Sequence, residues 1–253
     1  VLVTGERGSG KSLVASAIHR ASRRSAAPFE TIDCAAVTPS ELEVALFGVE
    51  GEGNGFAAVG VLERAGEGTV HLHAVDALPS EVQDRLQAAL QSQQILRVGA
   101  SRPVPLRARI ISSTAAPLRQ RAEEGTFRRD LFYRLDVVTI AVPPLRERRE
   151  DIPLLANFFL EKFNRKHGRQ VEKLAFETVM ILCSHSWPGN VGELEQQIEG
   201  LVALAPQPVI RPCDLPSALQ REMGANENGV SAANVPLKEA KRRFEREYFR
   251  DLL

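Results

Sequence analysis

Short apolar, β-rich runs alternate with amphipathic stretches through the first 142 residues. The strand candidates are Val1–Thr4, Phe29–Asp33, Thr69–His73, Arg109–Ser113 and Val137–Ala141. Runs of this length, separated by helical stretches, are typical of a parallel sheet with helices on its faces. The pattern therefore predicts an α/β fold over residues 1–142.

After Pro143 and Pro144 the apolar positions recur at helical spacing. We expect helices at about residues 151–166, 175–184, 190–204 and 214–222. This spacing predicts a small all-α domain over residues 143–222. Residues 223–235 are rich in Asn, Gly, Ala and Ser and predict a linker, and Pro236 opens a charged amphipathic helix over residues 236–253.

The segment between the first strand candidate and the first helix has the pattern of a phosphate-binding loop. Its residues are Gly5, Glu6, Arg7, Gly8, Ser9, Gly10, Lys11 and Ser12, and Leu13 continues into the helix. Glycines let the backbone wrap around phosphates, and the helix N-terminus adds positive potential. The lysine reaches the terminal phosphates and the serine hydroxyl binds Mg²⁺. The sequence predicts ATP or ADP here; the alternative is a turn with a purely structural role.

The third strand candidate ends without the acidic pair that a nucleotide hydrolase needs to orient Mg²⁺ and activate water. His73 and Ala74 stand there instead, and a neutral imidazole is a poor ligand for Mg²⁺. Ser12 is then the remaining predicted protein ligand. If the strand stays extended, Asp76 lies ~10 Å beyond His73, so we expect it outside the site. His71 and His73 share a strand face, but partly buried or solvated histidines are favoured over a metal site.

Composition narrows the class of protein. The 253 residues carry 32 Lys+Arg against 32 Asp+Glu, so there is no overall electrostatic footprint for nucleic acid. Three widely spaced cysteines fit a reducing cytoplasm. Without a signal-peptide pattern or an 18-residue apolar run, we expect a cytoplasmic location and no membrane contact. The chain begins on a strand and stops inside a helical pattern, as a segment of a longer protein would.

Two further stretches carry local signals. Residues 49–60 are rich in glycine and predict a flexible loop with Phe56 as its apolar tip. The charged run at residues 146–151 alternates in sign, which favours a solvated hinge network over a nucleic-acid patch.

Many of these segments occur in one characteristic order. Besides the phosphate-binding loop they include Pro28–Ala36, Leu46–Gly48, Arg97–Gly99, Arg109–Ile111, Phe127–Leu135, Pro143–Arg148 and Trp187–Val191. Together they resemble the central AAA+ domain of bacterial enhancer-binding proteins, the activators of sigma-54 RNA polymerase. The resemblance covers residues 1–222 and implies a P-loop AAA+ sheet followed by a helical lid. The helix from residue 237 is similar to one that leads into a DNA-binding helix-turn-helix in this family, which implies a DNA-binding domain outside this chain.

Set against that family, the chain has lost several functional groups. Where the family has its acidic pair, this chain has His73 and Ala74. It has Ala115 in place of the polar sensor and Gly192 in place of the lid arginine. Asp33 stands where the family has an asparagine that restrains the catalytic glutamate. The loop tip that touches the sigma factor is absent from residues 49–60, which argues against the sigma factor of RNA polymerase as a partner.

Other parts of the family pattern remain. Arg128 and Arg134 match arginines that reach the nucleotide of a neighbouring subunit in a ring, where such a group stabilises a γ-phosphate. The resemblance therefore implies self-association into a ring or dimer. The alternative is that Arg128 is a solvated helix charge and Arg134 an interface residue.

These observations favour a nucleotide-binding AAA+ module of a DNA-binding transcriptional regulator that is deficient in hydrolysis. An active ATPase that remodels sigma-54 RNA polymerase, with Asp33 or Asp76 replacing the lost acids, is one alternative. A nucleotide-free scaffold for oligomerisation or signal relay is another.

Overall fold

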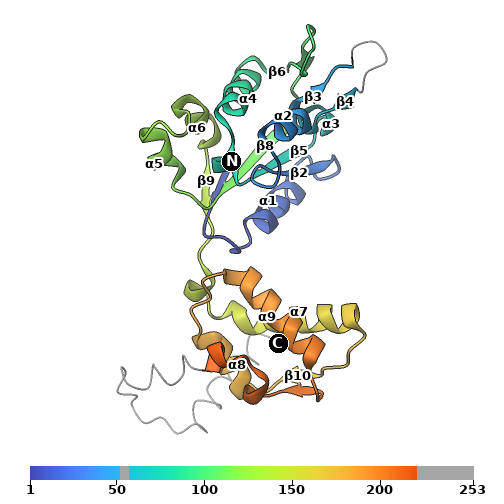
Figure 1. Ribbon diagram of the computed structural model, residues 1–253, viewed down its shortest axis with the longest axis vertical. Helices are drawn as coiled ribbons and strands as arrows, with labels where there is room; N and C mark the ends of the chain where they lie inside the picture. Colours follow the sequence, from blue (N-terminus) through green and yellow to red (C-terminus); the bar gives the residue numbers. More distant parts are fainter. Residues whose placement is uncertain (52–56, 221–253) are drawn as a thin grey trace. The chain divides into compact units, whose positions relative to one another are not determined.

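The predicted alternation folds into a five-stranded parallel sheet in the order β2-β5-β8-β1-β9 (Figure 1). The computed structural model describes residues 1–51 and 57–220. The strands are β1 (Leu2–Thr4), β2 (Phe29–Asp33), β5 (Thr69–His73), β8 (Arg109–Thr114) and β9 (Thr139–Ala141). All five predicted strands are present, with ends shifted by two residues or fewer, and the α/β prediction is confirmed.

Helices cover both faces of this sheet because its strands carry apolar side chains on alternate sides. Leu2, Val70 and Leu72 belong to the core on one face, and Val3 and Ile111 to the core on the other. Helix α1 (Lys11–Arg20) packs against Val3 and Ile111 through Ala15. The opposite face is covered by α2 (Pro39–Phe47), α3 (Val61–Arg64), α4 (Ser80–Ser92), α5 (Leu118–Glu123) and α6 (Arg129–Leu135).

The chain beyond the sheet is mainly helical, as predicted. Its elements are the 3₁₀ turn η2 (Leu145–Glu147), α7 (Asp151–His167), α8 (Phe176–Ser184), α9 (Asn190–Leu204) and the 3₁₀ turn η3 (Pro212–Asp214). A short parallel ladder joins β10 (Lys173–Leu174) to β11 (Val209–Ile210). Helical periodicity did not predict this ladder, because two residues are too few to carry an alternating pattern.

Two antiparallel pairs were also absent from the prediction. They join β3 (Gly48–Val49) to β4 (Ala58–Val59) and β6 (Gln94–Ile95) to β7 (Val104–Pro105). The first pair flanks the glycine-rich loop. The loop tip at Phe56, the predicted linker at residues 223–235 and the predicted helix at 236–253 lie outside the described residues.

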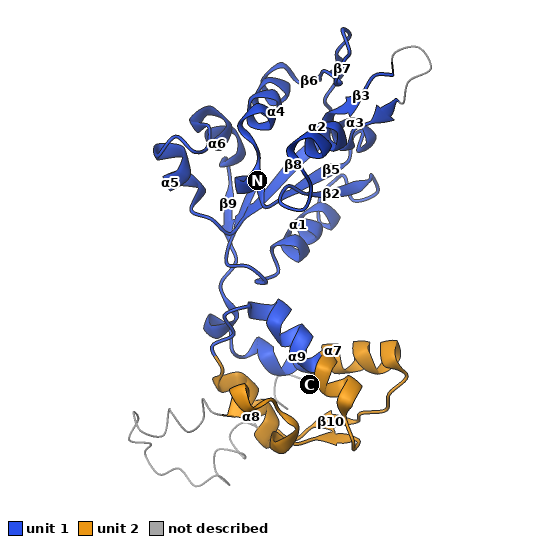
Figure 2. Ribbon diagram, viewed as in Figure 1, with its two compact units in different colours: residues 1–156, 186–198 blue, residues 157–185, 199–253 orange. Residues whose placement is uncertain are grey.

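The chain forms two compact units that are interleaved in sequence (Figure 2). Unit 1 comprises residues 1–156 and 186–198, and unit 2 comprises residues 157–185 and 199–253. Unit 1 thus contains the sheet, η2 and the start of α9. The predicted boundary at residue 142 stays a prediction. Among the described residues, every helix is too short or too polar to cross a bilayer.

Candidate functional site

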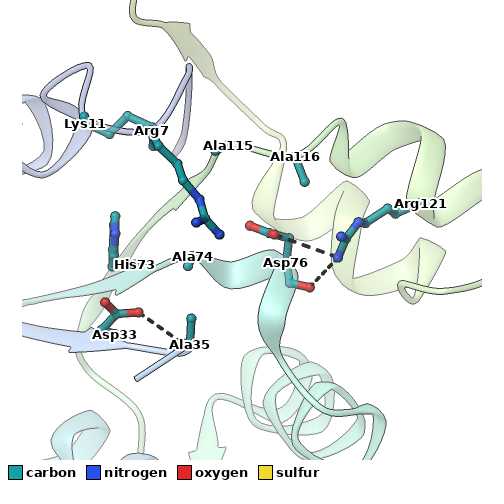
Figure 3. A pocket seen from close by; sticks show the side chains of 11 residues that line it. Arg7, Lys11, Asp33, Ala35, His73, Ala74, Asp76, Ala115, Ala116 and Arg121 are labelled. Carbon is teal, nitrogen blue, oxygen red and sulfur yellow. Dashed lines mark hydrogen bonds and ion pairs between the residues drawn. The ribbon is translucent and has the colours of Figure 1, made fainter. Parts of the chain in front are cut away.

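Unit 1 carries a cavity of about 560 Å³ at the carboxyl ends of its parallel strands (Figure 3). Loops that follow neighbouring parallel strands meet at one edge of the sheet, which is where such folds bind ligands. The loops after β1, β2, β5 and β8 all contribute here. The lining residues are Arg7, Gly8, Lys11, Asp33, Ala35, His73, Ala74, Asp76, Ala115, Ala116 and Arg121.

The predicted phosphate-binding loop leads directly from β1 into α1. Gly8 (φ 73°) and Gly10 (φ 99°) both adopt positive φ, which glycine tolerates without strain. Gly10 precedes α1, and within the described residues no side chain caps the helix and its first turn has no acidic residue. The uncapped N–H groups and the helix dipole therefore favour an anion at this point.

Lys11 lies buried at the start of α1, with 5 % of its surface exposed. Its Nζ donates to the carbonyl oxygens of Gly5 at 2.8 Å and Glu6 at 2.7 Å. Burial lowers the pKa of the Lys11 ammonium, the charge of Asp76 opposes that effect, and the charge of Arg7 adds to it. The loop thus holds a lysine against its own backbone, at the edge of the cavity.

Ser9 adds an unused polar group to the loop. Its hydroxyl is buried, and among the described residues it has no hydrogen-bond partner. A buried hydroxyl without a partner is costly unless a ligand or water satisfies it. Together with the uncapped helix and Lys11, this orphaned atom fits a bound phosphate.

Ser12 and Leu13 occupy the exposed first turn of α1. The Leu13 N–H donates to the Gly10 carbonyl at 3.0 Å, so the helix begins regularly. Neither side chain lines the cavity. Their predicted contacts with nucleotide and Mg²⁺ therefore stay predictions.

Behind the loop, Glu6 binds residues from η2 and from the start of α9. Arg146 donates to both Glu6 carboxylate oxygens, at 2.7 and 2.9 Å, and Asn190 donates to Glu6 Oε2 at 3.0 Å. The bonds from Arg146 first, and then from Asn190, lower the Glu6 pKa to about 2. Arg148 also donates to the Ser9 carbonyl at 2.6 Å. For the charged run at residues 146–151 we predicted a solvated hinge network, and these two arginines bind the phosphate-binding loop.

Gly192, which stands where the resemblance implies an arginine, lies against the same loop. Its N–H donates to the Gly8 carbonyl at 3.3 Å. A Cβ at Gly8 would lie 2.1 Å from the Gly189 carbonyl oxygen, so position 8 requires glycine for close packing as well as for its φ. The start of α9 therefore supports the loop by backbone contacts.

The two histidines of β5 share one hydroxyl. His71 Nε2 and His73 Nδ1 each lie 3.0 Å from Ser113 Oγ on the neighbouring strand β8. Because a hydroxyl has one proton, at least one imidazole donates to it. Burial, and secondarily the charge of His73, lowers the His71 pKa to about 4. No group of three metal-binding side chains occurs in residues 1–51 and 57–220, and the histidines act as strand-to-strand contacts.

Asp76 lies in the cavity, contrary to the sequence-based expectation. Ala74 adopts a left-handed conformation (φ 52°, ψ 50°) and the next three residues form the 3₁₀ turn η1 (Val75–Ala77). The chain therefore turns at Ala74 where an extended strand would have carried Asp76 away. A left-handed alanine is uncommon, so the sequence carried no signal for this turn.

The Asp76 carboxylate is already bound within the chain. Thr114 Oγ1 donates to Asp76 Oδ1 at 2.6 Å. Arg121 NH1 donates to the Asp76 carbonyl at 2.8 Å and lies 3.8 Å from Asp76 Oδ2. Sequence reasoning missed Arg121, which lies on α5 and meets Asp76 only through the fold.

Asp33 also lies in the cavity, paired in register with His73. Its Oδ1 accepts the Ala35 N–H at 3.0 Å. Mg²⁺ requires oxygen ligands in near-octahedral geometry. With His73 and Ala74 at the end of β5, Asp76 Oδ1 bonded to Thr114 and the Arg121 guanidinium beside Asp76 Oδ2, the residues present do not fit a magnesium site built from protein carboxylates.

Arg128 and Arg134 are held by contacts within the chain. Arg128 binds the carboxylates of Asp84 and Asp130, and Arg134 NH1 donates to the Leu90 carbonyl at 2.9 Å. Neither residue lines the cavity. Their predicted role toward a neighbouring subunit stays a prediction.

The chain is similar to known proteins along almost its whole length. Residues 1–141 match the model of the sigma-54 interaction domain, and residues 146–232 match that of the AAA+ ATPase lid domain. The nitrogen assimilation regulatory protein NtrX of Azorhizobium caulinodans is 43 % identical over 255 residues, which cover 98 % of this chain and 56 % of NtrX. The chain thus spans about half the length of this relative.

Solved structures of NtrX from Brucella abortus have the same fold. The complex with ADP superposes with a TM-score of 0.80 at 39 % identity, covering 96 % of this chain and 56 % of that one. The complex with ATP gives 0.79 at 40 % identity, covering 98 % and 55 %.

Proposed function

The chain belongs to the sigma-54 interaction domain family, and we propose that its cavity binds ATP or ADP as the AAA+ module of a DNA-binding transcriptional regulator. The observation that carries this proposal is the loop around Lys11, which combines a buried ammonium, an uncapped helix N-terminus and the orphaned Ser9 hydroxyl within three consecutive residues. Each of these groups favours a phosphate. The ADP and ATP complexes of the similar NtrX support an adenine nucleotide.

The proposed contacts to nucleotide come from the phosphate-binding loop. Its backbone N–H groups would hold the phosphates while Lys11 exchanges its two carbonyl partners for phosphate oxygens. Arg148 and the Glu6–Arg146 ion pair keep the loop in shape from behind. The proposed binding residues are Gly5, Glu6, Arg7, Gly8, Ser9, Gly10, Lys11, Ser12 and Leu13.

We further propose that the module hydrolyses nucleotide poorly or not at all. Water activation needs a base within hydrogen-bonding reach of the water, and Ala74 supplies none where the family resemblance implies a glutamate. His73 is bound to Ser113 and Asp76 to Thr114 and Arg121. Removing one positioned electrostatic group typically lowers kcat by ~10²–10³, and several are absent together.

An active ATPase is the second candidate, because Asp33 and Asp76 both line the cavity. Steady-state phosphate release with and without Mg²⁺ distinguishes an active ATPase from a hydrolysis-deficient module. Turnover that depends on Mg²⁺ and is lost in Asp76→Asn would favour the active enzyme. Background release in wild type would favour the hydrolysis-deficient module.

We propose the partners of the whole protein from its family resemblance. Self-association into a ring or dimer would bring Arg128 or Arg134 to a neighbour's nucleotide once their contacts within the chain open. DNA contact would come from a domain outside this chain, and the location would be the cytoplasm. The sigma factor is not among the proposed partners, because residues 49–60 lack the contacting tip that the family resemblance implies. A nucleotide-free scaffold is the remaining alternative.

Calorimetric titration with ADP tests the binding proposal. Wild type and the control Lys173→Ala, an exposed lysine in β10, should bind equally, and Lys11→Ala should not bind. A 100-fold excess of ligand over Kd should stabilise wild type by about 2.7 kcal/mol. Equal affinity in Lys11→Ala would refute the proposed site, and no binding by wild type would favour the scaffold.

A further inference from the structure

Three positively charged side chains and two carboxylates line the cavity. Arg7, Lys11 and Arg121 line it together with the carboxylates Asp33 and Asp76. The three cations come from two separate segments, the phosphate-binding loop and α5. Polyphosphates require such neutralisation, and a divalent metal or arginine side chains can supply it.

Arg7 is the cation with the most freedom to reach a ligand. It belongs to the phosphate-binding loop, and its side chain extends into the cavity toward Asp76 (Figure 3). It is exposed, and its charge acts on the neighbouring Lys11 strongly enough to help lower the pKa of that ammonium. A bound anion between Arg7 and Lys11 would relieve this repulsion.

Arg121 stands on the other side of the cavity, beside Asp76 (Figure 3). One guanidinium nitrogen is used by the Asp76 carbonyl, and the ion pair with Asp76 Oδ2 is long at 3.8 Å. Its side chain is 42 % exposed, so it can still donate to a ligand. The planar guanidinium binds phosphate oxygens in pairs, which a lysine cannot do.

Asp76 does not offer a matching metal site. Asp76 Oδ1 accepts from Thr114, and the Arg121 guanidinium lies beside Asp76 Oδ2, so a divalent cation there would meet a positive charge that is already in place. At the end of β5, His73 and Ala74 provide no oxygen ligand. The charge that Mg²⁺ would bring is thus already present as protein cations.

We propose that this site binds the nucleotide polyphosphate without a divalent metal, with Arg7 and Arg121 neutralising the terminal phosphates beside Lys11. The inference rests on the proposed nucleotide-binding function. It makes Arg7 and Arg121 specificity residues for the charged end of the nucleotide. A site of this kind would respond to nucleotide even when magnesium is scarce.

Calorimetric titration of the full chain with ADP, in excess EDTA and in millimolar MgCl₂, tests the proposal. The two dissociation constants of wild type should agree within about threefold, because the metal adds little charge that the site lacks. Arg7→Ala and Arg121→Ala should each weaken binding at least about tenfold in EDTA, the expected loss of a charge-assisted contact to phosphate.

Arg119→Ala is the matched control, since Arg119 lies on the same helix, is 81 % exposed and pairs with Glu123. It should bind like wild type. Because Arg121 also contacts Asp76, Arg121→Lys tests whether a loss reflects folding: it keeps the charge and should bind more tightly than Arg121→Ala but more weakly than wild type. Melting temperatures without ligand identify any variant that fails to fold.

The outcomes separate this inference from the proposed function. Binding in MgCl₂ that is lost in EDTA would overturn metal-free binding and leave the nucleotide site intact. Equal losses in Arg119→Ala and Arg121→Ala would overturn the role of Arg121. Absence of binding in both buffers would refute both proposals.

Discussion

Where a nucleotide hydrolase carries an acidic side chain, His73 binds Ser113 on the neighbouring strand. The exchange replaces a hard oxygen ligand by an imidazole that holds two strands together. Beside it, Ala74 provides a turn in place of a base. These two adjacent residues are the basis of the proposal that the site holds a polyphosphate without activating water.

His73→Asp should make nucleotide binding depend on magnesium. The added carboxylate supplies an oxygen ligand, so Mg²⁺ should raise ADP affinity by about tenfold in the variant, while phosphate release stays at background because Ala74 still provides no base. Titration in EDTA and in MgCl₂, together with a phosphate-release assay, measures both effects. Unchanged magnesium dependence would show that position 73 does not face the metal side of the nucleotide. Adding Ala74→Glu should return partial hydrolysis.

His71 should make unfolding stability depend on pH. Its pKa is about 4 in the fold against an ordinary value of 6.5, because burial disfavours the charged ring. The unfolded state therefore takes up the proton first, and stability falls as pH drops from 6.5 toward 4. Between pH 6.5 and 5 the loss should be on the order of 2 kcal/mol. Urea unfolding at both pH values measures it, with His71→Leu as the control that flattens the difference; an equally steep loss in that variant would contradict the assignment.

At the scale of elements, two short segments bind the phosphate-binding loop. The loop contributes Glu6, η2 contributes Arg146, and the first residue of α9 contributes Asn190. Asn190 Oδ1 also accepts the Leu145 N–H at 2.8 Å, so one amide side chain links η2 to the loop. These bonds fix the loop from its rear while its front stays open to the cavity.

Glu6→Gln should weaken both the fold and nucleotide binding. The neutral amide loses the charge-assisted pair with Arg146 that holds the Glu6 pKa at about 2. The contribution of that carboxylate is present above its ordinary pKa of 4.5 and is lost as pH falls toward 2. Thermal unfolding of Glu6→Gln, Arg146→Ala and the double variant measures the coupling, with Glu150→Gln as an exposed control. Strictly additive effects would contradict the ion pair.

At the scale of the whole molecule, the proposed assembly depends on two arginines that make contacts within their own chain. Arg128 is held by two carboxylates of its own chain and Arg134 by the Leu90 carbonyl. If a neighbouring subunit bound these arginines to its nucleotide, both sets of contacts would have to open. Assembly and nucleotide occupancy would then be coupled without turnover.

Measuring the ATPase rate as a function of protein concentration tests whether assembly activates hydrolysis. We expect background phosphate release at every concentration, in wild type as in Lys11→Ala, because assembly cannot supply the missing base. Sedimentation of the same samples reports whether assembly occurs. A magnesium-dependent rate near 1 s⁻¹ that rises with protein concentration, roughly the lower end of ordinary turnover, would contradict the hydrolysis-deficient module and favour an active enzyme.

The five strands of the sheet and the helical lid were predictable because each depends on local periodicity. The position of Asp76 was not. Its approach to the cavity depends on the left-handed turn at Ala74, which glycine would have signalled and alanine did not. Arg121 was missed for a different reason, since it meets Asp76 across 45 residues of sequence.

By itself, the sequence determined the five strands of the central sheet, the helical region that follows them, the phosphate-binding loop at residues 5–12 and the absence of acidic side chains at positions 73 and 74. These follow from residue types and their spacing along the chain. Only the tertiary structure decided which charges line the same cavity. It also decided that Asp76 accepts from Thr114 and lies beside Arg121, and that Glu6 accepts from Arg146 and Asn190. The physical reason is that charge neutralisation acts over a few ångströms in space, and sequence spacing does not report such distances.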